Sequence, residues 1–505
     1  MKRPGLIRAA IVVVAVVLLE LACRLGYIRK KLMVPPSEMA VRLSELVREQ
    51  EFWLQFSGTA RNIVIAFSCA LFFGFCIGVV VHGLPLFRRA IEPLIASWYA
   101  LPFFVLYPLF IVLFGMNAIP IIIVGFLYAL MAMVTGTLSG LDRIPPVLDK
   151  VSRTYRLDRF RDALLIKLPA AAPHVFTGSK LALGYAVTGV IGSEFILANS
   201  GLGYSIAFAY NDFDDRTMYG MLLFVMLLVS ALTIGLHAME KRVQHRSGAG
   251  HASKKTATAS ATQRGLLALA IVAILLITWQ LLHWRTGHEA IASPGATAAR
   301  IQRLFYSAEF WANLQETSRA LGLSLLLSCL GGAVIGIALG ASRRASEIFE
   351  PMLVTLYSLP KVTLYPVVLL FCGIGLMAKV VFGALYGMIP MALITMNAIR
   401  NMNPVYRRTA RVMRLNGGQS VATIMVPATL PEIVTGLRIA FSITLLGVMI
   451  GEMFASKRGL GFMIMNSIGV NDTPTLMAVT VIIGVFAVTI NSALLAIDRR
   501  VHRMA

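Results

Sequence analysis

The chain has 505 residues, of which 57% are hydrophobic and only 14% are charged, and its mean hydropathy is +0.76. Soluble domains carry charge on roughly a quarter of their residues, so this composition excludes a soluble globular protein and indicates an integral membrane protein. The net charge of +22 invites a nucleic-acid partner, but the basic residues gather in short segments between apolar runs, where the positive-inside rule explains them better.

Twelve apolar runs follow one another along the chain, each near the ~20 residues that a membrane-spanning helix needs. The first, at 8–27, resembles a secretory signal that ends at a lipoprotein cysteine, Cys23. However, Glu20 stands where such a signal needs an aliphatic residue, so we expect a retained span. The other runs are predicted at 62–83, 93–114, 119–138, 174–197 and 217–237, and then at 265–284, 320–340, 351–373, 378–398, 432–454 and 473–496.

The second half of the chain repeats the first without a gap. Trp53 falls on Trp311, a shift of 258 residues, and the same shift brings Glu194 onto Glu452. A segment rich in Gly, Ala, Ser and Thr separates the copies and is typical of a flexible linker. We therefore predict a first six-span repeat at 1–240, a cytoplasmic linker at 241–264 and a second six-span repeat at 265–505.

The repeat and the loop charges together predict an architecture. Because each copy has an even number of spans, the halves enter the membrane in the same sense and are related by a pseudo-twofold axis along the membrane normal, which encloses a pathway. Basic residues place the linker, the C-terminal tail and the longest loops in the cytoplasm, so both termini are expected there. Arg29, Lys30 and Lys31, which this topology places outside, are an exception.

The longest cytoplasmic loop of each half lies between its fourth and fifth spans. One loop continues from Arg156 as RLDRFRDALLIKLPAAAPHVFTG and the other from Arg414 as RLNGGQSVATIMVPATLPEIVTG. Both loops resemble the signature loop of binding-protein-dependent ABC importer permeases, in particular the nitrate, sulfonate and taurine branch. Prolines restrict the backbone at the entry to the fifth span and predict a stiff, sharp turn. These prolines are Pro169, Pro173, Pro427 and Pro431.

The resemblance implies an all-α, MetI-like fold in the bacterial inner membrane. It implies two separate ATP-binding cassette ATPase subunits on the cytoplasmic side and a periplasmic or extracellular substrate-binding protein. In the family a short helix of each loop sits in a cleft of the ATPase. The residues that match this helix are Arg156, Leu157, Asp158, Arg159 and Phe160 in the first loop and Arg414, Leu415, Asn416, Gly417 and Gly418 in the second.

Both loops depart from the family pattern at the same places. The usual Glu-Ala-Ala start reads Lys150-Val151-Ser152 in one copy and Arg408-Thr409-Ala410 in the other, so a base replaces the acid twice. Arg156 and Arg414 stand where the family has glycine. A solvated basic turn is the alternative on charge alone, but the shared hydrophobic and proline spacing of the two copies favours the ATPase contact.

The third span of each half combines proline breaks with polar side chains, as a substrate pathway requires. A packing kink is an equal alternative. Lys361 has Phe103 as its counterpart, so any electrostatic attraction would be one-sided. The candidate pathway residues are Tyr99, Pro102, Tyr107, Tyr357, Ser358, Pro360, Lys361 and Tyr365.

Two acidic residues, Glu194 and Glu452, lie near the outer ends of the fifth spans. Intramembrane acids are functional candidates, and by resemblance these belong to an outer gate. A hydrogen bond to the adjacent glycine turn is an equal alternative.

The predicted function is that of a permease subunit that imports a small solute, such as a sulfonate, taurine or nitrate anion, among membrane lipid and without a nucleic-acid partner. No GxxxxGK[ST] occurs, so ATP hydrolysis is expected in another subunit and the chain is not an enzyme. The five cysteines lack metal-ligand spacing, and no cofactor or metal site is predicted. A gradient-driven carrier with two parallel six-span halves is the alternative.

Overall fold

The computed structural model describes residues 3–29, 31–84, 87–88, 91, 95, 98, 101–244, 261–287 and 291–504. Within these residues the chain is helical and no strand occurs. Helices satisfy every backbone hydrogen bond within one segment, which is what a lipid environment requires. The predicted linker falls mostly outside the described residues.

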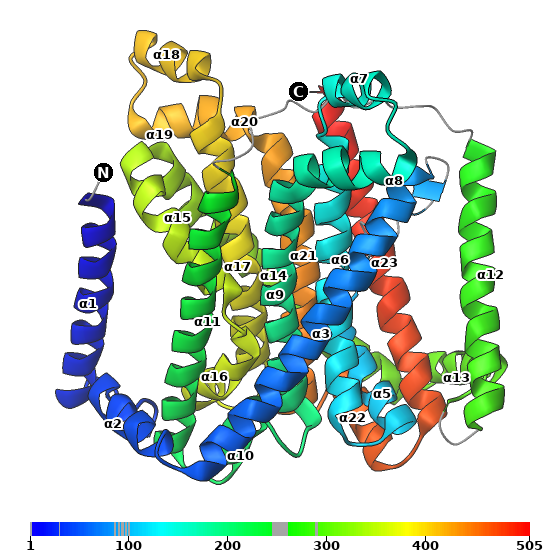
Figure 1. Ribbon diagram of the computed structural model, residues 1–505. Coiled ribbons are helices and arrows are strands. Elements are labelled where there is room, and N and C mark those ends of the chain that lie inside the picture. The colour runs from blue at the N-terminus through cyan, green and yellow to red at the C-terminus, as the bar shows by residue number, and fades with distance from the viewer. Residues whose placement is uncertain are drawn as a thin grey trace.

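The first half begins with a membrane-length helix, α1, and continues through eleven further helical elements in the described part of the chain (Figure 1). They are α1 (Arg3–Arg24), α2 (Pro36–Leu46), α3 (Gln50–Gly83), η1 (Phe103–Leu106), α5 (Tyr107–Phe114), α6 (Ala118–Asp142), α7 (Pro146–Thr154), α8 (Arg159–Asp162), the π turn η2 (Ala163–Lys167), α9 (Leu168–Leu197), α10 (Leu202–Asn211) and α11 (Asp215–Gln244).

The second half repeats this order. Its elements are α12 (Ala261–Thr286), α13 (Pro294–Phe305), α14 (Ala308–Ala341), α15 (Arg343–Ser358), η3 (Lys361–Leu364), α16 (Tyr365–Cys372), α17 (Leu376–Asn401), α18 (Pro404–Val412), α19 (Gly417–Ser420), the π turn η4 (Val421–Met425), α20 (Val426–Ala428), α21 (Leu430–Phe454), α22 (Leu460–Gly469) and α23 (Thr473–Met504).

Nine helical segments of the described chain are long and apolar enough to cross a membrane. A tenth span is the pair α15 and Lys361–Cys372, which is bent by 85°. This bend confirms the predicted proline break in the third span of the second half. Of the other two predicted spans, 265–284 coincides with α12, and 93–114 is described only in part.

Small residues bring the central helices together. A Cβ added at Gly74 of α3 would lie 2.6 Å from Cβ of Met133 on α6, and one at Gly332 of α14 would lie 2.6 Å from Cβ of Met391 on α17. Membrane helices associate through close packing of this kind, because lipid provides no hydrophobic drive between them. The repeat therefore preserves the glycines that fix helix spacing.

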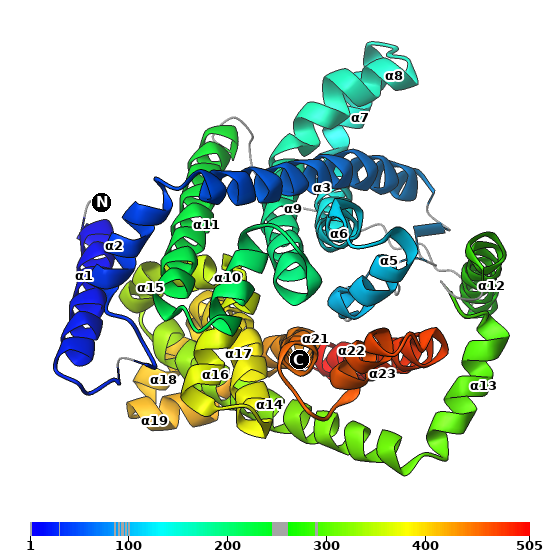
Figure 2. The same ribbon diagram turned by 90° about the horizontal axis from the view of Figure 1, so that it is seen from below.

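The two halves also interlock. The 3₁₀ turn η3 of the second half packs on α9 of the first, and η1 of the first half packs on α21 of the second. Figure 2 shows α9 and α21 near the middle of the molecule. Each proline-broken third span thus meets the fifth span of the other half at the interface.

One end of the bundle carries α7 and α18, and both described chain ends lie toward it (Figure 1). Viewed along the bundle, α7 and α8 lie at one margin of the molecule and α18 and α19 at the opposite margin (Figure 2). The opposite end carries the short helices α2, α10, α13 and α22, which the hydropathy pattern did not predict as separate elements.

Candidate transport pathway and cytoplasmic loops

The loops around α7–α8 (residues 143–167) and α18–α19 (residues 402–425) form the same turn. Arg156 and Arg414 have φ of 48° and 49°, in the left-handed region that favours glycine. In each loop the next residue, Leu157 or Leu415, donates its N–H to a carbonyl oxygen five residues earlier at 3.1 Å. This is a Schellman motif with arginine at the C′ position. Glycine, which the family has at these positions, adopts this left-handed backbone conformation without strain.

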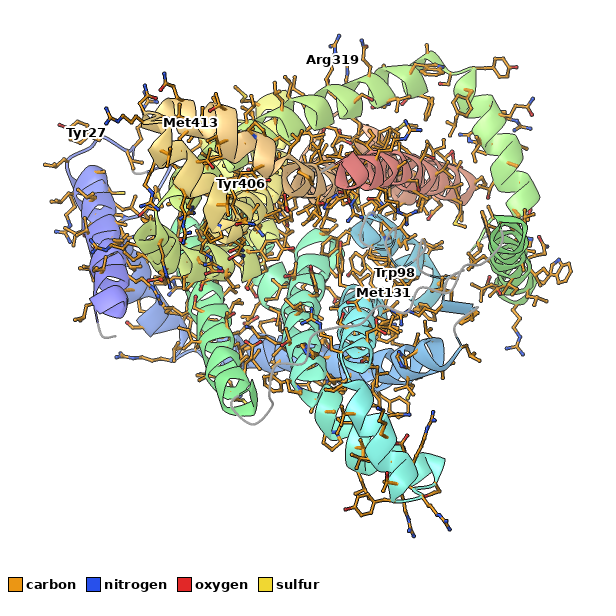
Figure 3. The ribbon with its side chains drawn as sticks, turned by 90° about the horizontal axis from the view of Figure 1, so that it is seen from above. Tyr27, Trp98, Met131, Arg319, Tyr406 and Met413 are labelled. Carbon is orange, nitrogen blue, oxygen red and sulfur yellow. The ribbon has the colours of Figure 1, made fainter. Side chains whose placement is uncertain are left out.

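Both loops expose apolar as well as basic side chains. Tyr155 is 74% exposed, Val412 83% and Met413 63%, whereas Leu157 and Leu415 are half-buried. Met413 lies toward the margin of the molecule in the view along the bundle (Figure 3). The two leucines were predicted to contact the ATPase, but the more exposed side chains are these neighbours, which lie one or two residues before Arg156 and Arg414.

The turns after the arginines differ in their caps. Asn416 accepts a hydrogen bond from the backbone N–H of Gln419 at 2.8 Å and donates its own N–H to the Gln419 side chain at 3.1 Å, a capping box that starts α19 at Gly417 and Gly418. Asp158 takes this position in the first loop, with Arg161 at 3.6 Å. Arg159 and Phe160 form the start of α8.

Among the described residues, ion pairs occur within the first loop but not within the second. Lys167 Nζ lies 2.7 Å from Asp162 Oδ2, and this hydrogen bond, helped by one from Ser152, holds the pKa of Asp162 below its usual value. Ser420 and Met425 occupy the corresponding positions of the second loop.

The four loop prolines do not all form the sharp turn that the sequence suggested. In the first half Pro169 lies in the first turn of α9 and Pro173 inside it, and the helix runs on without a break. In the second half Pro427 belongs to α20 and Pro431 to the first turn of α21, with a break at Thr429. Proline is tolerated in a first helical turn because its missing N–H has no partner there, and a π turn precedes each segment.

A cavity of about 660 Å³ lies between the two halves. Its walls come from α6, α9 and α11 of the first half and from α15, α17, α21 and α23 of the second, so it lies at the predicted pathway position. Most of the lining is apolar. The polar and aromatic side chains that line it include Trp98, Phe103, Tyr128, Lys180, Tyr185, Thr188, Tyr357, Ser358, Lys361, Tyr386, Arg438, Ser442 and Asn491.

Lys361 is the cation of the cavity that has no carboxylate partner among the described residues. Its Nζ donates to the backbone carbonyl of Tyr357 at 3.0 Å and lies 4.8 Å and 5.3 Å from the ring centroids of Tyr357 and Tyr386. The side chain is only 7% exposed. The start of η3 holds it there, directly after Pro360. An ammonium group over aromatic faces is stabilised by cation–π attraction.

The other two cations of the lining are neutralised. Lys180 Nζ lies 2.8 Å from Glu240 Oε2, and Arg438 Nε lies 3.6 Å from Asp498 Oδ2. Lys180 and Arg438 are counterparts in the repeat. These pairs therefore join the fifth and sixth spans of each half and leave no net charge.

Tyrosines connect the two halves across the cavity. The hydroxyls of Tyr185 on α9 and Tyr357 on α15 lie 3.3 Å apart. Tyr386 is 3% exposed, and its hydroxyl has no hydrogen-bond partner among the described residues. Tyr128 and Tyr386 are counterparts in the 258-residue repeat, and this identity is a signal by which the sequence could have indicated both tyrosines.

An aromatic contact closes the interface on the side away from the loops. Phe195 near the end of α9 stacks on Phe454 at the end of α21, with ring centroids 4.4 Å apart and planes at 26°. Phe195 follows the cavity residue Thr188 by two helical turns, roughly 10 Å along α9. The cavity therefore lies between this stack and the end that carries α7 and α18.

The predicted pathway residues separate into two groups. Ser358, Lys361 and Tyr357 line the cavity, and Pro102 and Pro360 start the 3₁₀ turns next to lining residues. Tyr107 and Tyr365 are buried beside it and donate to the carbonyl oxygens of Leu197 at 3.3 Å and Gly451 at 2.8 Å. Tyr99 lies outside the described residues.

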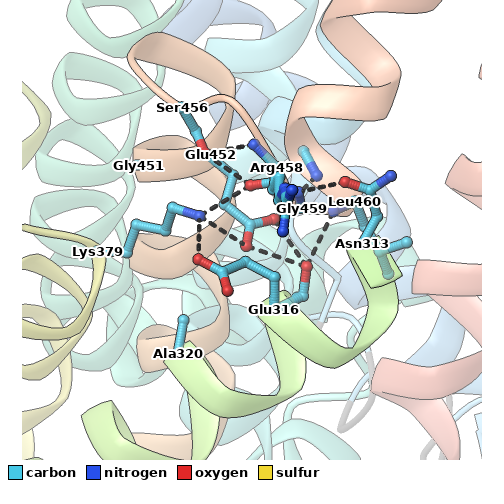
Figure 4. A network of polar contacts seen from close by, with 12 residues as sticks. Asn313, Glu316, Ala320, Lys379, Gly451, Glu452, Ser456, Arg458, Gly459 and Leu460 are labelled. Carbon is cyan, nitrogen blue, oxygen red and sulfur yellow. Dashed lines mark hydrogen bonds and ion pairs between the residues drawn. The ribbon is translucent and has the colours of Figure 1, made fainter. Parts of the chain in front are cut away.

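Glu194 and Glu452 do not line the cavity. Glu452 Oε2 accepts from Thr317 at 2.9 Å and from the backbone N–H of Gly461 at 3.0 Å, and Thr317 in turn accepts from the N–H of Leu460 at 2.9 Å (Figure 4). Glu194, Thr59, Leu202 and Gly203 make the corresponding bonds in the first half. Both acids are 1% exposed and hold the glycine loop after the fifth span, the alternative that the sequence had left open.

The glycine loop depends on backbone geometry that only glycine adopts easily. Gly201 has φ of 105° and ψ of 169°, and Gly459 has φ of 128° and ψ of 165°. A Cβ at either position would overlap the carboxyl carbon of the nearby glutamate. The second half adds Lys379, whose Nζ lies 3.1 Å from Glu316 and 4.0 Å from Glu452 (Figure 4).

Comparison with known proteins supports a duplicated permease. The family described as binding-protein-dependent transport system inner membrane component matches residues 70–247 and 332–503. The chain is 27% identical over 239 residues to the putative aliphatic sulfonates transport permease protein SsuC of Bacillus subtilis, covering 47% of this chain and 86% of that protein.

Two further relatives have similar coverage. The chain is 30% identical over 205 residues to a probable ABC transporter permease protein of Haemophilus influenzae, covering 40% of this chain and 83% of that protein. It is 26% identical over 245 residues to the taurine transport system permease protein TauC of Escherichia coli, covering 46% of this chain and 88% of that protein. Each relative thus corresponds to about half of this chain.

Proposed function

The chain belongs to the family of binding-protein-dependent transport system inner membrane components, and from this premise we propose that it moves a small organic anion inward through the cavity between its two halves. It is an ABC importer permease in which two family domains are fused in one chain. ATP is hydrolysed by two separate ATPase subunits, and a periplasmic or extracellular binding protein delivers the substrate. The relatives named for sulfonates and taurine support a substrate that carries a sulfonate group.

Two like loops at one end of the molecule carry this proposal. They lie at opposite margins of the bundle, so each is accessible to its own ATPase subunit (Figures 2 and 3). The first loop continues through a π turn into α9, and the second continues through a π turn, α20 and the break at Thr429 into α21. Both α9 and α21 line the cavity. A force on a loop is thereby transmitted to the cavity wall. The loop end is cytoplasmic, as the positive-inside rule favours, and both termini lie on this side.

The charges of the loops specify the ATPase surface. Three exposed basic residues recur at three-residue spacing in both copies, and none of the six forms an ion pair among the described residues. They are Lys150, Arg153 and Arg156 in the first loop and Arg408, Arg411 and Arg414 in the second. A partner cleft with carboxylates at these positions would complement them. The usual family acid has become a base, so we expect the ATPase to carry the compensating acids.

The aromatic stack supplies the outer closure in this mechanism. With Phe195 against Phe454 the cavity is closed toward the binding protein and belongs to an inward-facing state. ATP binding draws the loops together, turns α9 and α21 and separates the two rings, so that substrate enters from outside. Hydrolysis restores the stack. Lys361 attracts the anion while it occupies the cavity.

The coupling assignment is tested with a double variant in which Leu157 and Leu415 are both changed to Asp. Two half-buried leucines become charged, which is expected to separate ATP hydrolysis from uptake of taurine, nitrate or an alkanesulfonate without preventing membrane insertion. Copurification of the ATPase with the permease gives a second readout. The control Phe213→Asp changes a side chain that is 89% exposed at the opposite end and is expected to retain the ATPase.

Unchanged uptake in the double variant would refute the coupling assignment. Uptake in vesicles that needs an ion gradient, is abolished by an uncoupler and proceeds without ATP would refute the importer mechanism as a whole. It would favour a gradient-driven carrier instead.

A further inference from the structure

We infer that the cavity is itself a selective binding site for a planar, ring-bearing organic anion, such as an aromatic sulfonate or carboxylate. This inference rests on the proposed function and names the substrate class. It assigns selectivity to the permease as well as to the binding protein that delivers the substrate.

The size of the cavity argues against the smallest anions. An apolar cavity of about 150 Å³ is enough to hold benzene, and pockets for organic ligands measure about 300–1,000 Å³. The cavity of about 660 Å³ lies well inside that range. Nitrate or a two-carbon sulfonate would leave most of the lining without contact, so its affinity would be low.

The shape of the lining favours aromatic rings. Trp98 and Phe103 have ring centroids 5.0 Å apart, and Phe103 meets Tyr128 edge to face at 5.4 Å. Tyr185, Tyr357 and Tyr386 continue this aromatic surface toward the second half. Aromatic pairs of this geometry gain stability beyond their buried area, and a planar ligand can replace or extend them.

The charge of the lining favours one negative group. No Asp or Glu is among the described lining residues. Lys180 and Arg438 already have carboxylate partners, which leaves Lys361 as the one basic side chain among the described lining residues without such a partner. The Tyr386 hydroxyl has no hydrogen-bond partner among the described residues. The centroid of its ring lies 5.3 Å from Lys361 Nζ. One anionic oxygen bound by both groups would satisfy them together.

The repeat then gives the ligand an orientation. Phe103 and Lys361 are counterparts, and Phe103 packs on Tyr128 as Lys361 lies over its counterpart Tyr386. A symmetric lining would be apolar or charged on both sides. This lining has a ring on one side and a cation on the other, which complements a molecule with an apolar ring at one end and an anionic group at the other.

The test uses the full chain in nanodiscs, without ATPase or binding protein. Calorimetric titrations compare 2-naphthalenesulfonate with methanesulfonate, nitrate and the uncharged 2-naphthalenemethanol. We expect 2-naphthalenesulfonate to bind at least tenfold more tightly than each of the others. Equal binding of all four probes, or tighter binding of nitrate or methanesulfonate, would overturn the inference.

Variants assign the binding to the residues. Lys361→Met is expected to weaken 2-naphthalenesulfonate about tenfold and to leave 2-naphthalenemethanol unchanged. Lys379→Met is the matched control, because it removes another buried lysine, one that does not line the cavity. Tyr386→Phe removes one hydroxyl without altering packing and is expected to weaken the sulfonate about threefold, which keeps the inference testable if Lys361→Met does not fold.

The two proposals fail separately. If Lys361→Met and Tyr386→Phe bind the sulfonate as the unchanged chain does, the cavity inference is wrong while ATP-driven uptake still supports the importer. If the sulfonate binds as expected but uptake does not depend on ATP, the binding site stands and the proposed function is wrong.

Discussion

At the glycine loops the two halves make the same hydrogen bonds, whereas around the cavity they carry different charges. Thr59 and Thr317 each donate to a buried glutamate and accept from the loop backbone. Phe103 and Lys361, by contrast, are an apolar and a charged residue at equivalent positions. The repeat therefore retains the groups that fix the backbone and varies those that a solute would meet.

The halves also differ at two places outside the cavity lining. Ile121 in the first half corresponds to Lys379 in the second, where a buried cation joins the Glu452 network. Asp142 pairs with Arg88 at 2.5 Å, whereas its counterpart Arg400 pairs with Glu350, so the charge at this position changes sign and its partner comes from a different position of the repeat. Charged groups therefore differ between the halves outside the cavity as well.

The largest effect is expected from Gly459→Ala. Its backbone conformation is almost confined to glycine and the added Cβ would overlap the Glu452 carboxyl. Strain and overpacking together should lower the free energy of unfolding by about 4 kcal/mol, seen as a lower melting temperature in detergent. Gly469→Ala, with open space around it, is the control. Equal melting temperatures for the two variants would contradict the assigned role of the loop.

The threonines of the two halves should differ in a measurable way. Thr59→Val leaves a buried carboxylate and a backbone N–H without their partner and should cost about 2–3 kcal/mol of unfolding free energy. Thr317→Val should cost about 1 kcal/mol less, because Lys379 remains 4.0 Å from Glu452. Combining Thr317→Val with Lys379→Met should remove this difference between the two halves. If Thr317→Val is the costlier change, Lys379 does not support the loop.

A charge swap tests the ion pair between Arg400 and Glu350. Arg400→Asp places two acids together and should lower stability by about 1 kcal/mol, since the pair is roughly one third exposed. The double change Glu350→Arg with Arg400→Asp should recover most of this loss. A double-mutant cycle in thermal unfolding measures the coupling between the two sites. A coupling free energy near zero would mean that the pair is incidental.

The smallest effect is expected in the loops. Arg156→Gly or Arg414→Gly relieves a left-handed arginine and should raise the unfolding free energy by about 0.5–1 kcal/mol. Arg411→Gly, inside α18, should instead lower it by about 1 kcal/mol. Changes of opposite sign in the unfolding free energy, measured by thermal unfolding, would support the Schellman turn. A lower unfolding free energy in both kinds of variant would argue against it.

Much of the fold could be predicted because local composition decides it. Apolar runs of span length and the proline break at Pro360 each act within one segment of chain, and the shift that brings Trp53 onto Trp311 is found by comparing the sequence with itself. The short helices α2 and α13 escaped prediction because they are amphipathic and lie against other helices. The continuous start of α9 also differed from expectation, because the helix runs on through Pro173 although this residue lacks the N–H of a regular interior residue.

The sequence by itself determined the spans, the duplication and the loops that start at Arg156 and Arg414. Only the tertiary structure decided that Glu194 and Glu452 hold glycine loops and that Tyr185, Tyr386 and the Phe195–Phe454 stack lie at the interface. The reason is physical. Lipid is as apolar as a protein core, so hydrophobic patterning does not distinguish a lipid face from an interface. Tyr185 and Tyr357 meet across 172 residues of chain, and no local signal encodes such a contact.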